Sequence, residues 1–154
     1  MKIHARLLSV LLALFASLAA GCAASSNQVV PFPPQDVALT RPDHTRIYFV
    51  RHDNAPLQKR ALRVLEGDTE IGKLTAGTYL CWERPAGRTI ARVFYEAVDP
   101  SRGNVDGIGD LDCAAGRVYF FNVEVGPEDG KPIISALTPD EGRELVARRK
   151  AAGE

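Results

Sequence analysis

The side chains of this 154-residue chain that could carry chemistry are three cysteines, three histidines and a few carboxylates. Cys22 follows an apolar run near the N-terminus, whereas Cys81 and Cys113 lie far along the chain. A cysteine sulfur can accept a lipid, form a disulfide or attack a substrate, and its compartment and neighbours decide which. The segment before Cys22 therefore has to be interpreted first.

Residues 1–21 have the three parts of a secretion signal. Lys2 and Arg6 give a basic start, Leu7 to Leu18 form an apolar run, and small residues precede Cys22. The run is too short to span a bilayer, which takes about 20 apolar residues. We therefore expect a transient signal that is removed during export.

The pentapeptide Leu18 to Cys22, Leu-Ala-Ala-Gly-Cys, resembles a bacterial lipobox. The resemblance implies diacylglycerol on the Cys22 sulfur, cleavage after Gly21 and N-acylation of the new amino terminus, which together would hold the protein on a bilayer. Ala23 is not the aspartate that retains such lipoproteins in the inner membrane, so the resemblance implies the outer membrane, facing the periplasm. The alternative is ordinary secretion with cleavage after Ala20, which leaves Cys22 a free thiol.

Export also bears on the two remaining cysteines. An isolated pair in an oxidising envelope favours a Cys81–Cys113 disulfide, which would close a span of 113 − 81 = 32 residues. Two buried cysteines in separate places are the alternative. A nucleophilic Cys81 is a third possibility, but no histidine at a diagnostic local spacing supports it.

Other candidate groups are weaker. His44, His52 and Asp53 could form a metal site or a catalytic dyad, but His52 ends a predicted strand, where polar residues commonly face solvent. A calcium site could use four polar residues of one loop, but they lack the spacing of a twelve-residue, helix-flanked loop. These residues are Asn104, Asp106, Asp110 and Asp112. The sequence therefore predicts no metal site and no cofactor besides the covalent lipid on Cys22.

Two aromatic residues, Tyr79 and Trp82, could form an exposed platform for a glycan or peptide. In a strand Tyr79 shares a face with Cys81, and Trp82 shares the other face with Leu80, so at least one aromatic ring should be in the core.

Composition divides the chain into a signal peptide (1–21), a lipidated tether (22–43), a β-sandwich domain (44–137) and a C-terminal helix and tail (138–154). The tether is rich in Ser, Gln, Ala and Pro and buries little apolar surface, although a proline-rich docking motif is an alternative. The chain has 19 basic and 19 acidic residues, and loss of Lys2 and Arg6 leaves a formal charge of −2. This balance argues against a nucleic-acid partner.

Strand patterns dominate the domain and predict an antiparallel β-sandwich of about seven strands. Gly67 and Asp68 suit a two-residue hairpin turn, with Val64 facing Ile71 across it. The segment from Asp99 to Asp112 is predicted as a polar loop leading into a short edge. The predicted strands are Thr45 to His52, Leu62 to Glu66, Thr69 to Leu74, Thr78 to Glu83, Arg88 to Val98, Arg117 to Val125 and Lys131 to Leu137.

One helix is predicted, from Pro139 to about Ala151. Thr138 and Glu141 have the spacing of a capping box, with proline at the first helical position. Its apolar stripe is narrow, so we expect loose docking and a frayed end.

The order of these motifs resembles a family of bacterial lipoproteins of unknown function with a domain similar to PEGA and carboxypeptidase-regulatory sandwiches. The resemblance covers roughly residues 45–145, and Ala86 and Arg88 depart from the usual turn pattern. It implies a fold and no activity. The matching residues are Arg46 to Arg51, Glu66-Gly67, Ile71 to Leu74, Gly77 to Tyr79, Pro85 to Gly87 and Ala115 to Phe120.

Three kinds of function remain open on these grounds. We favour a non-enzymatic binding or structural module of the cell envelope, with an envelope protein as partner through a strand edge or end loops. The alternative is a periplasmic inhibitor or immunity protein against a cell-wall hydrolase, acting through the Asp99 to Asp112 loop. An enzyme would need His52 to meet a partner inside a pocket, and no phosphate loop, dinucleotide fingerprint or nucleophile elbow is present.

Overall fold

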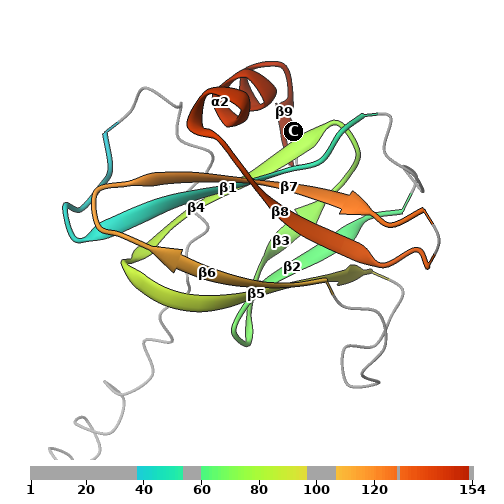
Figure 1. Ribbon diagram of the computed structural model, residues 1–154, viewed down its shortest axis with the longest axis horizontal. Helices are drawn as coiled ribbons and strands as arrows, with labels where there is room; N and C mark the ends of the chain where they lie inside the picture. The colour runs from blue at the N-terminus through green and yellow to red at the C-terminus, as the bar shows by residue number, and fades with distance from the viewer. Residues whose placement is uncertain (1–37, 54–59, 97–106, 128, 153–154) are drawn as a thin grey trace, which may run out of the picture.

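A computed structural model describes residues 38–53, 60–96, 107–127 and 129–152 of the chain. Within these ranges two β-sheets face each other, and a helix lies on the outer face of one of them (Figure 1). The prediction of a mainly β sandwich with one C-terminal helix is confirmed, with about nine strands rather than seven.

Sheet A has five strands in the order β8-β7-β1-β4-β9. Their bounds are β8 (Pro132–Leu137), β7 (Val118–Val125), β1 (His44–Val50), β4 (Thr78–Pro85) and β9 (Lys150–Ala151). The β1–β4 and β7–β8 pairs are antiparallel, but β1–β7 and β4–β9 are parallel, which an antiparallel sandwich does not predict. Parallel neighbours need a long connection, so their pairing cannot be inferred from local turns.

Sheet B has four strands in the order β3-β2-β5-β6, all antiparallel. Their bounds are β3 (Thr69–Leu74), β2 (Leu62–Glu66), β5 (Gly87–Tyr95) and β6 (Gly107–Cys113). The predicted hairpin between β2 and β3 is present, and Gly67 takes a φ of 56° in its turn. Val64 lies opposite Gly72 rather than the predicted Ile71, because the register shifts between Val64 and Leu65 and adds one residue on β3.

Strand β6 corrects the predicted loop from Asp99 to Asp112, of which residues 99–106 lie outside the described ranges. The glycine and polar residues of this segment predicted a loop, but Gly107 and Gly109 serve close packing. A Cβ on Gly107 would lie 2.3 Å from the Pro132 carbonyl oxygen, and one on Gly109 would lie 3.2 Å from Ile134. The glycines therefore let the edge of sheet B approach β8 of sheet A.

The core between the sheets follows from strand alternation. Ile47 and Phe49 of β1 pack between the sheets, whereas Tyr48 and Val50 face the helix, so β1 is buried on both sides. The core cluster also includes Leu62, Val64, Leu74, Leu80, Trp82, Ala91, Val93, Leu111, Phe121 and Val123.

Helix α2 (Pro139–Ala147) starts at the predicted capping box of Thr138 and Glu141. It covers the outer face of sheet A (Figure 1), where Val146 packs with Tyr48 and Phe120. Val146 is buried, and a Cβ on Gly142 would lie only 2.1 Å from Phe120 Cγ. The predicted loose docking is therefore wrong, and the helix ends before the predicted Ala151 because β9 follows it.

Candidate functional site

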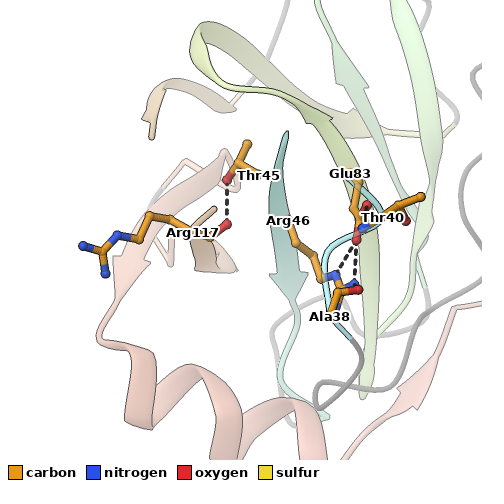
Figure 2. Close-up of polar contacts among 6 residues, drawn as sticks. All are labelled: Ala38, Thr40, Thr45, Arg46, Glu83 and Arg117. Carbon is orange, nitrogen blue, oxygen red and sulfur yellow. Dashed lines mark hydrogen bonds and ion pairs between the residues drawn. The ribbon is translucent and has the colours of Figure 1, made fainter. Parts of the chain in front are cut away.

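A buried ion pair is the main polar feature on the outer face of sheet A. Arg46 of β1 lies directly opposite Glu83 of β4, and its side chain shares the face of Tyr48. Arg46 donates to Glu83 Oε1 from Nε at 3.0 Å and from Nη2 at 2.6 Å (Figure 2). The two side chains are 1% and 4% exposed. Such a pair is held in low dielectric and must satisfy its remaining hydrogen-bonding groups locally.

Residues 38–43, which we call the N-terminal strap, supply those further bonds. The Thr40 N–H donates to Glu83 Oε2 at 3.0 Å, and Arg46 Nη2 donates to the Ala38 carbonyl oxygen at 3.1 Å (Figure 2). Two more main-chain bonds fix the strap, from the Ala86 N–H to the Asp43 carbonyl oxygen and from the His44 N–H to the Arg41 carbonyl oxygen. Sequence reasoning had placed these six residues in the tether.

Both partners of the pair are stabilised in their charged forms. Burial acts to raise the pKa of Glu83, but the bonds from Arg46 and Thr40 outweigh it and hold the pKa below the usual glutamate range. Burial also acts to lower the pKa of Arg46, and the Glu83 carboxylate more than offsets this effect. The arrangement can therefore hold a neighbouring chain segment, and it offers no activated nucleophile.

Cys81 lies next to this pair, on the same face of β4, opposite Tyr48. Burial raises the pKa of the Cys81 thiol to about 12, so the thiolate needed for nucleophilic attack is scarce near neutral pH. Burial likewise raises the pKa of Tyr48, whose ring stacks on Phe120 with centroids 5.0 Å apart. The site around Cys81 is thus packed and unreactive.

The predicted Cys81–Cys113 disulfide is wrong for this structure, in which both cysteines are free and buried. Cys81 belongs to the cluster between sheet A and the helix, whereas Cys113 belongs to the core between the sheets. Sheet A separates the two thiols, so the alternative of two buried cysteines in separate places applies.

The histidine candidates lie at opposite ends of β1. His52 Nδ1 is 3.1 Å from Arg149 Nη2, and the same guanidinium reaches Asp53 Oδ1 at 3.5 Å. His44 Nδ1 is 3.0 Å from Asp43 Oδ1. His52 therefore meets a cation rather than a carboxylate or a thiol, which is not the geometry of a catalytic dyad.

The calcium candidates are only partly described, because Asn104 and Asp106 lie outside the described ranges. Asp110 and Asp112 belong to the regular strand β6, and Asp110 Oδ2 accepts from Arg88 Nη2 at 2.6 Å. Among the described residues, no three His, Cys, Asp or Glu side chains gather in a group that could hold a metal ion.

The aromatic candidates do not form an exposed platform. Trp82 is in the core, where its Nε1 donates to Glu66 Oε2 at 2.8 Å, and Tyr79 packs against the cluster beneath the helix. The prediction that at least one aromatic is a core residue is confirmed. The predicted faces of the strand are confirmed as well, because Tyr79 and Cys81 belong to the cluster under the helix, whereas Leu80 and Trp82 belong to the core between the sheets.

Sequence reasoning missed an apolar surface on the outer face of sheet B. Ile90 of β5 is 52% exposed and Ile108 of β6 is 67% exposed. They are diagonal neighbours on this face, because Ile90 pairs with Asp110 and Arg92 pairs with Ile108. We call these two residues the isoleucine surface. It was hidden in the sequence because β6 had been predicted as a loop.

Comparisons with known proteins give no family. No family model matches the chain, and no curated protein matches it. The solved NMR structure of a protein from Eubacterium rectale is similar over 68% of this chain and 98% of its own, with 10% sequence identity and a TM-score of 0.42. Gly21 and Cys22 lie outside the described residues, and no helix among the described residues is long and apolar enough to cross a membrane.

Proposed function

We propose that this chain is a lipid-anchored protein of the bacterial outer membrane, facing the periplasm, whose β-sandwich is a non-enzymatic binding or bracing module. The observation that carries this proposal is the Leu18 to Cys22 pattern at the end of a secretion signal. Acyl chains on Cys22 anchor the protein, and a partner in the envelope binds the domain.

The isoleucine surface supports a protein partner. Two exposed isoleucines lie among charged side chains. Arg88 and Asp110 form an ion pair beside them, and Arg92, which lies opposite Ile108, forms an ion pair with Asp68. An apolar centre with a charged rim is typical of surfaces that proteins bind.

The placement of this surface also fits a tethered module. The N-terminal strap contacts the outer face of sheet A, whereas Ile90 and Ile108 lie on the outer face of sheet B. The two sheets separate the N-terminal strap from the isoleucine surface, which leaves this surface free of the strap.

The anchor is tested with Cys22→Ser, which removes the sulfur that accepts the lipid. Wild-type protein is expected in the membrane fraction and to incorporate labelled palmitate, whereas the variant is expected in the soluble fraction without label. Retention of the variant in the membrane would contradict lipid anchoring.

The binding surface is tested with a photoreactive amino acid in intact cells. Placed at Ile108, it is expected to give one cross-linked protein of discrete mass, which is lost when Ile90→Asp is added. The matched control is the same probe at Glu144, an exposed residue of helix α2 on the opposite side of the sandwich. Equal capture from both positions, or capture of lipid alone, would contradict a partner at this surface.

A further inference from the structure

The N-terminal strap is held mostly through its main chain. Four hydrogen bonds to the domain use a backbone N–H or carbonyl group of the strap, at Ala38, Thr40, Arg41 and Asp43. Two side chains add to them, since Asp43 Oδ1 lies 3.0 Å from His44 Nδ1 and the Thr40 side chain also hydrogen-bonds to Glu83. Backbone groups of the strap therefore make most of its bonds to the domain.

Two of these four bonds come from the Arg46–Glu83 pair. The carboxylate accepts from the Thr40 N–H, and the guanidinium donates to the Ala38 carbonyl oxygen, so one ion pair supplies both an acceptor and a donor to the backbone of the strap. Hydrogen bonds to charged groups are stronger than neutral ones, and the burial of this pair limits competition from water.

The geometry points to a clamp: the Arg46–Glu83 pair grips the end of the membrane tether and makes residues 38–43 part of the domain. The tether predicted for residues 22–43 then ends at residue 37. Six fewer extended residues shorten its maximum reach by about 19 Å at roughly 3.1 Å per residue. The clamp itself does not need the lipid, but this limit on reach rests on the proposed anchoring at Cys22.

A matched pair of variants at position 40 separates the contribution of the backbone N–H from that of the side chain. Thr40→Pro removes the N–H that Glu83 accepts and leaves the ion pair intact. Thr40→Ala removes the side chain, whose hydroxyl also hydrogen-bonds to Glu83, and keeps the N–H. Glu83→Gln tests the other partner, but it leaves a buried arginine without its carboxylate and can unfold the domain.

The first measurement is NMR of the full chain in detergent. In wild type and Thr40→Ala, the amide of residue 40 is expected to exchange slowly and Leu39 to have an order parameter near 0.85, as in rigid backbone. In Thr40→Pro the order parameter of Leu39 is expected to fall below about 0.6. In folded Glu83→Gln the residue-40 amide is expected to exchange at least about tenfold faster. An unprotected residue-40 amide in wild type, or equal order at Leu39 in the two Thr40 variants, would overturn the clamp.

The second measurement uses Trp82, the single tryptophan of the chain, as donor to a dansyl lipid in vesicles. Thr40→Pro lengthens the tether and is expected to lower energy transfer relative to Thr40→Ala. Equal transfer would contradict the shortened reach. Absence of transfer in wild type would contradict the lipid anchor, whereas the NMR result would still decide the clamp.

Discussion

Trp82 and Glu66 join the two sheets by a hydrogen bond of 2.8 Å between the indole Nε1 and a carboxylate oxygen. Trp82 belongs to β4 of sheet A and Glu66 to β2 of sheet B. The same carboxylate forms an ion pair with Arg84. One glutamate thus accepts from a buried indole and pairs with a largely buried guanidinium, which also donates from Nη1 to the Gly87 carbonyl oxygen at 2.9 Å.

Glu66→Ala should lower the free energy of unfolding by about 1–3 kcal/mol, because it leaves the buried Trp82 N–H without its acceptor. Urea unfolding followed by circular dichroism measures this loss. Glu70→Ala is the matched control, since Glu70 pairs with Arg63 at the surface and should cost less than about 1 kcal/mol. Equal losses in the two variants would show that the bond to Trp82 adds nothing.

Gly142→Ala should destabilise the domain by about 1–3 kcal/mol, although alanine is normally the better residue inside a helix. The reason is the approach of helix α2 to Phe120, which leaves no room for a methyl group. Thermal unfolding measures the effect, and Arg143→Ala on the exposed side of the helix should stay within about 0.5 kcal/mol. A stabilised Gly142→Ala protein would mean that the helix docks less closely.

A Cys22→Ser chain should contain two thiols, both protected in the folded protein. Burial raises the pKa of both thiols, for Cys81 to about 12, so alkylation near pH 8 should be slow until the chain unfolds. Mass spectrometry after iodoacetamide treatment counts the labelled cysteines in each state. A mobility difference between reduced and non-reduced samples would instead support a disulfide.

Acid should destabilise the protein in part through Glu83. The pKa of Glu83 in the folded state lies below the usual glutamate value of about 4.3. The contribution of Glu83 to the free energy of unfolding is therefore complete above about pH 4.3 and is lost as the pH falls through the folded pKa. Wild type should therefore exceed Glu83→Gln in stability by about 3–5 kcal/mol at pH 7. Urea midpoints between pH 7 and pH 3 should converge as the pH falls. A constant difference would show that the pKa of Glu83 is the same in the folded and unfolded states.

The sequence predicted most strands because alternation and turn residues are local signals. It failed at β6, where Gly107 and Gly109 were part of a predicted polar loop but allow contact with β8. It also failed at β9, because the two residues Lys150 and Ala151 carry no periodicity. The parallel pairs were missed for a third reason, since their partners lie far apart in the chain.

The candidate site was less predictable than the fold. Arg46 and Glu83 are 37 residues apart, and their pairing depends on the register of β1 against β4. The strap was not predicted because most of its bonds use main-chain atoms, which residue type does not reveal. The prediction of a disulfide is wrong because Cys81 and Cys113 lie in different sheets and face different layers of the domain. The alternation of side chains along a strand does not reveal which layer each face meets.

The position of β1 at the centre of sheet A has a kinetic consequence. β1 is the first described strand, yet one of its neighbours is β7, and the contact from Thr45 to the Arg117 carbonyl oxygen joins residues 72 apart. Sheet A cannot close until most of the chain has been synthesised, and contacts of such long range make folding slow. A newly made chain of this protein is therefore expected to complete sheet A only after β7 has been synthesised.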